Sequence, residues 1–449
     1  MRENGIEDGG NPLPDPYPFT EPQHPAPAPL TPYQPMTPHP SPVTRNLKMS
    51  TILRRLAHFS LPLIIVIAAM GAARSDIRRH DNGLARTPPM GWNSWNHFGC
   101  NVSAQLIRET ADAIAASGMR DAGYQYVTID DCWQVARDRN GVIIADSARF
   151  PDGIKPVADY VHTKGLKFGI YTDAGRLTCE RRPGSYGFED LDAKTYARWG
   201  VDYVKVDWCN AEGIDAPTQY AKIRDALLKS GRPIVYSICE WGFNRPWEWA
   251  QQTGNLWRTT GDIADRWNSV LTIVDLSSQY WHVARPGAWN DPDMLEVGNG
   301  GMSRDEYRSH FSLWAIMAAP LIAGNDVRTM QDSSRQAATT RELLLNTEVI
   351  AIDQDSLGVQ GMIAQNSPSE LQVWVKPLAD GSRALLLFNR ASVPSTITAA
   401  WDRVGIRTRQ ARVRDLWAHT ERGTFADRYG ATVPSHGVVM LRVWPVSSP

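Results

Sequence analysis

Acidic side chains follow several short apolar runs of this chain, a placement that suits acid–base or nucleophilic chemistry. The clearest example is Asp207, which follows four strand-forming residues in YVKVDWCN at 203–210. Similar runs that end in acids or other polar groups are YVTIDDCW (126–133), KFGIYTDAG (167–175), IVYSICEW (234–241), LWRTTGDI (256–263) and GAWNDPDML (287–295). A parallel barrel would bring these residues together, because its active site is built from the C-terminal ends of its strands.

Glycoside hydrolysis is one reaction that needs two carboxylates across a single bond. In its retaining form one carboxylate attacks the anomeric carbon and the other protonates the leaving oxygen, at a separation of about 5–5.5 Å. Metal binding is a competing use of paired acids such as Asp130 and Asp131. The acidic runs lack the calcium-loop pattern and nearby histidines, and the cysteines lack zinc-like spacing. We therefore expect no catalytic metal and no cofactor, while a structural calcium stays open.

Basic residues stand close to two of these acids. Lys205 precedes Asp207 by two residues, so both side chains point to the same side of a strand. A cation there favours an ionised Asp207, as a nucleophile requires. Arg258 precedes Asp262 and could hold either sugar hydroxyls or a carboxylate. The alternatives are a structural ion pair inside the barrel for Lys205 and a surface salt bridge for Arg258.

Helical segments that end in glycine separate the apolar runs. Residues 102–118 have apolar positions at helical spacing, a possible N-cap at Ser103 and Gly118 at the end. Gly165, Gly200 and Gly231 stand where later helices would end in a left-handed residue, each just before a strand. This alternation of helix, glycine and strand predicts βα units and a parallel sheet.

The strand candidates number eight once PPMGWNSW (88–95) and WAIMAAPLIAGND (314–326) join the six runs above. Eight units of this size predict an α/β fold, a (β/α)₈ TIM barrel over 84–355. A doubly wound sheet is disfavoured because no glycine-rich phosphate loop follows the first strand. From 356 to 449 short β runs are separated by turn residues, which predicts a small C-terminal antiparallel β-sandwich.

The N-terminal part has a different composition. Residues 1–48 contain 13 of the 31 prolines and no apolar periodicity, which predicts a disordered extension. Residues 49–73 combine arginines, the apolar run LPLIIVIAAM and small residues, as in a signal peptide cleaved after Ala73. Met49 is then the hypothetical initiator, and we expect a secreted or periplasmic protein without a stable membrane span. An uncleaved anchor is the alternative.

The overall composition restricts the partners. A formal net charge of −1 gives no reason to expect a nucleic-acid or anionic-membrane partner. The 17 tryptophans fit either core packing or sugar binding, because an indole face suits the apolar face of a pyranose.

Taken together, the ordered motifs resemble those of the retaining α-galactosidases and α-N-acetylgalactosaminidases, the melibiase family. The likeness covers residues 84–358 and is weaker in the C-terminal β region. The motifs that carry it are LARTPPMGWNSWNHFGC, IDDCW, GIYTDAG, KVDWCN, ICEWG, WRTTGDI, WNDPDML and IDQDSLG. The resemblance implies a carbohydrate substrate and hydrolysis by double displacement with net retention.

The resemblance also implies roles for individual residues. Asp207 corresponds to the nucleophile and Asp262 to the acid/base. The residues implied to bind galactose are Trp95, Asp130, Asp131, Tyr171, Lys205, Arg258 and Asp293, with Cys239 and Trp241 near the sugar 2-position. The bulk of Trp241 argues against N-acetylgalactosamine, and Glu240 is left outside the site. The implied disulfides pair Cys100 with Cys132 and Cys179 with Cys209.

Two other functions compete with α-galactosidase. A β-L-arabinopyranosidase would bind a sugar that is galactose without its 6-hydroxymethyl group, but one acid of IDDCW would then lack a hydroxyl partner. A non-catalytic galactose-binding protein would usually have lost the nucleophile or the acid, and both are present. The sequence therefore favours an enzyme that removes terminal α-linked galactose from oligosaccharides or galactomannans.

Overall fold

The computed structural model describes residues 82–446. The predicted extension 1–48 and signal peptide 49–73 lie outside the described residues. Eight parallel strands form one sheet in the order β10-β1-β2-β5-β6-β7-β8-β9. A parallel bridge between Leu295 and Ala323 connects the segment after β9 with β10, which closes the sheet into a barrel. The strands are β1 (Met90–Asn93), β2 (Tyr126–Thr128), β5 (Lys167–Asp173), β6 (Tyr203–Asp207), β7 (Val235–Ile238), β8 (Leu256–Arg258), β9 (Trp289–Asp291) and β10 (Leu321–Ala323).

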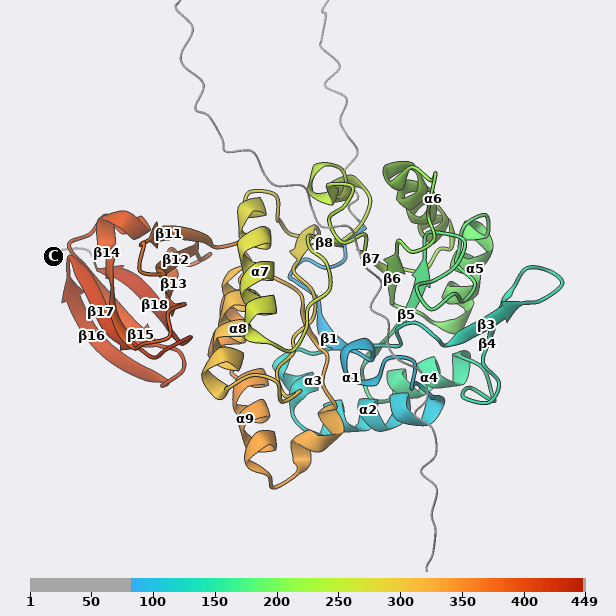
Figure 1. Cartoon of the computed structure of the whole chain (residues 1–449), viewed down its shortest axis with the longest axis horizontal. Coiled ribbons are helices and arrows are strands. Elements are labelled where there is room, and N and C mark those ends of the chain that lie inside the picture. The colour runs from blue at the N-terminus through green and yellow to red at the C-terminus, as the bar shows by residue number, and fades with distance from the viewer. Residues whose placement is uncertain (1–81, 447–449) are drawn as a thin grey trace, which may run out of the picture. The chain divides into compact units, whose positions relative to one another are not determined.

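Helices alternate with these strands and surround them (Figure 1). Ser103 caps the first long helix by accepting a hydrogen bond from the backbone of Leu106, as the sequence predicts. Gly165, Gly200 and Gly231 have φ values of 71°, 83° and 79°, so the helix–glycine–strand prediction is confirmed. The helices are α1 (Trp95–Phe98), α2 (Ala104–Ala116), α3 (Met119–Ala122), α4 (Lys155–Thr163), α5 (Glu189–Trp199), α6 (Ala216–Lys229), α7 (Trp267–Ser277), α8 (Arg304–Ile316), α9 (Arg335–Leu344) and α10 (Thr347–Asp353).

The alternation of side chains along β6 positions the chemistry. Val204 and Val206 are fully buried in the main hydrophobic core. Tyr203 belongs to a separate cluster with Tyr126, Leu256 and Trp289, which come from three other barrel strands, β2, β8 and β9. Because side chains alternate along a strand, Lys205 and Asp207 lie on the same side as Tyr203, successively closer to the C-terminal end.

Two segments differ from the sequence expectation. The candidate strand 314–326 is a strand only at Leu321–Ala323, and its first residues belong to α8. An apolar run buried in a helix looks like a buried strand. The start of α8 had a usable signal, because Ser303 and Glu306 form a capping box. A hairpin of β3 (Gln134–Arg137) and β4 (Ile143–Ala145) also interrupts the βα alternation after β2.

After α10 the structure changes to antiparallel strands, as predicted. Six strands form one sheet in the order β11-β12-β13-β18-β15-β16, and β14 pairs with β17. The core between them includes Val373, Leu385, Ile397 and Val433. The strands are β11 (Met362–Asn366), β12 (Leu371–Pro377), β13 (Arg383–Asn389), β14 (Ser395–Ala400), β15 (Gln410–Asp415), β16 (Thr420–Ala426), β17 (Arg428–Val433) and β18 (Val438–Val446). Within residues 82–446, no helix is both long enough and apolar enough to cross a bilayer.

Candidate active site

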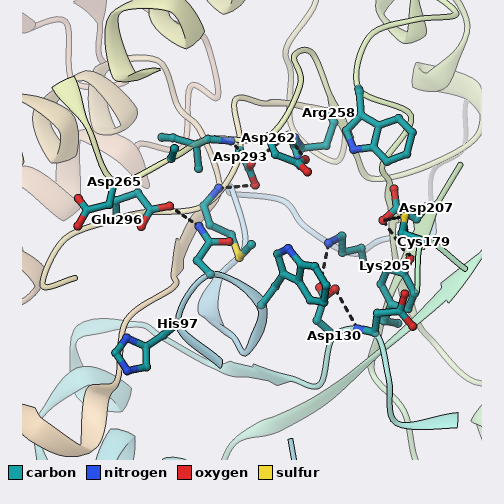
Figure 2. A pocket seen from close by; sticks show the side chains of 18 of the residues that line it. His97, Asp130, Cys179, Lys205, Asp207, Arg258, Asp262, Asp265, Asp293 and Glu296 are labelled. Atoms are coloured by element: carbon teal, nitrogen blue, oxygen red, sulfur yellow. Dashed lines mark hydrogen bonds and ion pairs between the residues drawn. The ribbon is translucent and has the colours of Figure 1, made fainter. Parts of the chain in front are cut away.

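A cavity of about 530 Å³ lies at the C-terminal ends of the barrel strands. This volume falls within the range of about 300–1,000 Å³ that is typical of small-molecule sites. Every residue that the sequence implied for catalysis or sugar binding lines this cavity, with the exception of Cys239. The lining residues from that set are Trp95, Asp130, Asp131, Tyr171, Lys205, Asp207, Trp241, Arg258, Asp262 and Asp293. Figure 2 shows the side chains that line this cavity, with Asp130, Lys205, Asp207, Arg258, Asp262 and Asp293 labelled.

Asp207 ends β6 and is only 6% exposed. The hydroxyl of Tyr171, on the neighbouring strand β5, donates a hydrogen bond to Asp207 Oδ2 at 3.1 Å. The sulfur of Cys179 lies 3.5 Å from the same oxygen. Burial raises the pKa of Asp207 to about 7, although the positive charge of Lys205 acts in the opposite direction.

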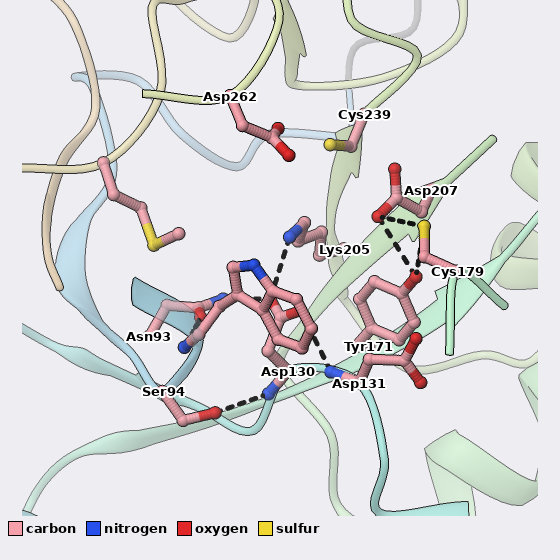
Figure 3. A network of polar contacts seen from close by, with 12 residues as sticks. Asn93, Ser94, Asp130, Asp131, Tyr171, Cys179, Lys205, Asp207, Cys239 and Asp262 are labelled. Atoms are coloured by element: carbon pink, nitrogen blue, oxygen red, sulfur yellow. Dashed lines mark hydrogen bonds and ion pairs between the residues drawn. The ribbon is translucent and has the colours of Figure 1, made fainter. Parts of the chain in front are cut away.

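Lys205 forms its ion pair with Asp130, at 2.9 Å between Nζ and Oδ2. Asn93 Nδ2 donates to the same Asp130 oxygen at 2.7 Å, so this carboxylate accepts from two strands (Figure 3). Asp131 accepts a backbone hydrogen bond from Glu180 at 3.1 Å, while burial raises its pKa. Asp130, Asp131 and Lys205 thus form a compact group of acceptors and one donor at the cavity wall.

Arg258 ends β8 and holds two carboxylates. It is 3% exposed, which excludes the surface salt bridge considered from the sequence. Its Nη2 lies 3.0 Å from Asp262 Oδ1 and 2.9 Å from Asp293 Oδ2. The Asp262 side chain is 62% exposed, whereas that of Asp293 is 4% exposed. Desolvation acts to raise the pKa of Asp262, but the positive charges of Arg258 and Lys205 outweigh it and lower that pKa.

The segment after β7 places Trp241 at the cavity. Trp241 has a φ of 56°, an uncommon conformation for a residue with a bulky side chain, and it lines the cavity together with Asp262. Glu240 is fully buried and does not line the cavity. Its Oε2 accepts from the backbone and side-chain nitrogens of Asn244, at 2.5 and 2.8 Å, which fixes the turn that presents Trp241.

Cys239, which the resemblance implied near the sugar 2-position, is not among the residues that line the main cavity. It is 1% exposed and lines a small neighbouring cavity together with Lys205, Arg258 and Asp291. Its sulfur lies 3.6 Å from Arg258 Nη1. The thiol therefore supports residues that face the main cavity. Asp291, which the sequence reasoning left out, is buried in the same place, and burial raises its pKa to about 6.

The disulfides pair as the resemblance implies, Cys100 with Cys132 and Cys179 with Cys209. Cys239 is the free cysteine of the described chain. Among residues 82–446, the two clusters with metal-ligand composition each contain one of these disulfides, so their sulfurs are not available as thiolates.

Sequence reasoning missed the far end of the cavity. The additional lining residues there include Asn96, His97, Asp265, Met294, Glu296 and Asn299. Each lies within six residues of a recognised motif residue, which was the available signal. Without the fold, nothing distinguished these neighbours from ordinary loop residues.

Comparison with known proteins identifies the family. Residues 87–355 match the family model described as alpha galactosidase A, and residues 368–443 match the alpha galactosidase C-terminal beta sandwich domain. An alpha-galactosidase of Cyamopsis tetragonoloba is 50% identical over 381 residues, which cover 84% of this chain and 91% of that protein.

Solved structures agree with this assignment. Alpha-galactosidase I of Mortierella vinacea superposes with a TM-score of 0.78 at 41% identity, covering 82% of this chain and 100% of the other. A β-L-arabinopyranosidase of Geobacillus stearothermophilus superposes with a TM-score of 0.75 at 26% identity, covering 83% and 99%. As its motifs predicted, the chain belongs to the α-galactosidase family of glycoside hydrolases.

Proposed function

We propose that this enzyme hydrolyses terminal α-linked D-galactose by double displacement, with Asp207 as the nucleophile and Asp262 as the acid/base. The observation that carries the proposal is the presence of both carboxylates on the wall of one cavity at the strand ends. Asp207 is buried and Asp262 is largely exposed in the free site. The two acids thus have the different environments that two roles require.

In the first step Asp207 attacks the anomeric carbon while Asp262 gives its proton to the glycosidic oxygen. The bond from carbon to that oxygen breaks, and the leaving group departs as an alcohol. A bound sugar covers the exposed carboxyl of Asp262, and the loss of water raises its pKa, which favours the protonated form that the step needs. In the second step Asp262 takes a proton from water, the water oxygen attacks the anomeric carbon, and Asp207 is released.

Galactose specificity is proposed to come from the group around Asp130. Asp130 and Asp131 offer carboxylate oxygens and Lys205 offers an ammonium group, which together suit the axial 4-hydroxyl and the 6-hydroxyl of galactose. A glucoside places its 4-hydroxyl equatorially and would leave these buried groups without partners. Trp95 lines the same cavity and would stack on the sugar face.

A β-L-arabinopyranosidase is the second candidate, because a protein of that description shares the fold over most of both chains. Its sugar would leave the acceptor for the 6-hydroxyl unpaired. Relative rates on nitrophenyl α-D-galactopyranoside and β-L-arabinopyranoside separate the two functions.

A panel of nitrophenyl glycosides, with products followed by NMR, tests the sugar and the stereochemistry together. We expect α-D-galactoside to be the best substrate and α-galactose to form first, before mutarotation. Initial release of β-galactose would indicate inversion and contradict the double displacement.

We further propose that the protein acts outside the reducing cytoplasm, in the periplasm or after secretion. Its two disulfides support this location, because such bonds persist in oxidising compartments. Fractionation of cells that make the full chain tests the location, and activity confined to the cytoplasm would contradict it.

A further inference from the structure

The cavity extends well beyond the residues assigned to galactose. We name the outer lobe as the part lined by Asn96, His97, Asp265, Glu296 and Asn299. Figure 2 shows Asp207 and Lys205 at one end of the cavity and Asp265 and Glu296 at the other, with Asp262 and Asp293 between them. A single galactose held by Asp130, Lys205 and Asp207 would leave the outer lobe open.

Glu296 fixes the orientation of two side chains of the outer lobe. Glu296 is only 3% exposed, and its two carboxylate oxygens accept hydrogen bonds from the side-chain amides of two different residues. Asn96 Nδ2 donates to Oε1 at 2.5 Å, and Asn299 Nδ2 donates to Oε2 at 2.6 Å. Burial raises the pKa of Glu296 to about 7, and above that pH the ionised carboxylate can only accept, so both amide groups turn their nitrogens toward it. The carboxamide oxygens of Asn96 and Asn299 therefore point elsewhere.

The same logic sets the orientation of His97. Its Nδ1 lies 3.1 Å from Asn299 Oδ1. Because that amide oxygen can only accept, His97 Nδ1 must carry the hydrogen, and in the neutral ring Nε2 is an acceptor. Asp265 accepts from the hydroxyl of Tyr307 at 2.7 Å and from the backbone of Gly301 at 2.6 Å, and its carboxylate oxygens have further lone pairs that can accept. The outer lobe is thus lined mainly by acceptors.

We propose that the outer lobe is the binding subsite for the leaving group, and that it selects a sugar whose hydroxyls donate to these acceptors. This inference rests on the proposed function, because it takes Asp262 as the group that protonates the leaving oxygen. Residues 263–265 continue from Asp262 along the cavity wall into the outer lobe. In the bound substrate, the leaving group is attached through the oxygen that Asp262 protonates, so it would extend along that wall.

Glu296 is accordingly a positioning residue that acts through Asn96, Asn299 and His97. The chemistry favours galactosyl oligosaccharides over galactosides with small or apolar leaving groups. Met294, which stands in the sequence between Asp293 and Glu296, adds an apolar surface to the same cavity wall. Such a surface suits the C–H faces of a sugar.

The test compares melibiose with α-galactosyl fluoride, whose leaving group is a single atom. Glu296→Gln keeps the shape but adds an NH₂ group, which must displace or reverse one of the two amides. We expect kcat/KM for melibiose to fall about tenfold or more, the equivalent of about 1.4 kcal/mol. The value for the fluoride should change less than about threefold, and inhibition by galactose should be unchanged.

His97→Ala provides a second variant at an exposed position and should lower kcat/KM for melibiose in the same selective way. Phe243→Ala is the matched control, since this side chain is 69% exposed and packs on Trp241 but does not line the cavity. A selective loss with Phe243→Ala would place the leaving group there and overturn the proposal.

Two further results would overturn the proposed subsite, provided that the wild type hydrolyses the fluoride. One is an equal loss of kcat/KM on melibiose and on the fluoride, and the other is no loss with either outer-lobe variant. A wild type inactive on both substrates would instead contradict the proposed function, and the subsite with it. A thermal melt of each variant identifies losses that come from unfolding.

Discussion

Lys205 donates to Asp130 at 2.9 Å, whereas Asp207 accepts from the Tyr171 hydroxyl at 3.1 Å and from the Trp208 backbone N–H at 3.2 Å. Sequence reasoning expected Lys205 to keep Asp207 ionised. The ammonium group does lower the pKa of Asp207, but burial has the larger effect and brings that pKa to about 7. Asp262 shifts in the opposite direction, because Arg258 and Lys205 lower its pKa. In the free enzyme, the single proton of this pair therefore resides mainly on Asp207.

The first prediction concerns pH. The productive form, with Asp207 ionised and Asp262 protonated, is a minor form of the singly protonated pair. We expect kcat/KM for melibiose to be bell-shaped, with a decline above a pH of about 7 as the pair loses its last proton. At low pH it should decline again as the pair gains a second proton. Steady-state rates across pH measure both limbs.

α-Galactosyl fluoride is the control for this profile, because fluoride departs without protonation. The doubly ionised pair is then competent, so the alkaline limb should disappear while Asp207 becomes fully ionised. A fluoride profile that also declines above neutral pH would show that the limb does not report the proton of Asp262.

Asp207→Asn should abolish turnover and leave sugar binding intact. The amide is a poor nucleophile of nearly the same shape, and we expect losses on the order of 10³-fold or more in kcat. Galactose affinity, measured by calorimetry, should remain within a few-fold of the wild type. Retained turnover, after exclusion of wild-type contamination, would remove Asp207 from the nucleophile role.

Asp262→Asn should separate substrates by their leaving groups. General acid catalysis contributes about 10²–10⁴-fold, and a substrate whose leaving group needs no proton loses little of it. Turnover of melibiose should therefore fall far more than formation of the covalent intermediate from dinitrophenyl galactoside, measured as a burst. Equal losses on both substrates would argue against an acid role for Asp262.

Trp241→Ala tests what closes the site near the sugar 2-position. The indole lines the cavity, so its removal should admit an acetamide group and raise the rate on N-acetylgalactosaminides relative to galactosides. The absolute rate on galactosides should fall, because the cavity loses part of the wall that holds the sugar. The ratio of kcat/KM on the two nitrophenyl glycosides measures the effect, and an unchanged ratio means that another residue excludes the acetamide.

The sequence predicted the barrel and most of the cavity for a physical reason. Parallel strands buried on both faces read as short apolar runs, and the acids at their ends, such as Asp207, stand out against them. The helical start of 314–326 was not separable from a strand, because α8 is buried over its whole C-terminal half. Its capping box at Ser303 would have resolved the ambiguity.

Contacts that depend on side-chain direction were not predictable. The pairing of Lys205 with Asp130, from strands far apart in the sequence, required the register of the closed sheet. The position of the Cys239 side chain beside Arg258 likewise depends on the direction in which the chain continues after β7. Glu296 looked like an ordinary loop acid, and only the fold shows that it is buried between two amides.

The last prediction concerns stability and uses the hairpin that the sequence did not reveal. Arg137 on β3 makes a bidentate pair with Asp192 on α5, with both nitrogen–oxygen distances at 2.7 Å. The Asp192 side chain is 2% exposed, and Ser185 also donates to it. Arg137→Ala would leave a buried carboxyl without its main partner. We expect a loss of about 3–5 kcal/mol in the free energy of unfolding, measured by denaturant titration.

Arg412→Ala is the matched control, because Arg412 pairs with Glu421 at 3.0 Å but both side chains are 45% exposed. That loss should stay within about 1 kcal/mol, since water and salt screen exposed pairs. Adding Asp192→Asn to Arg137→Ala should recover part of the stability, because the buried charge disappears along with its partner. If the double variant is instead less stable than Arg137→Ala, the cost comes from the lost contacts of Arg137 with the Gly141 and Gly184 carbonyls. The hairpin, and not the buried charge of Asp192, would then account for the stability of this region.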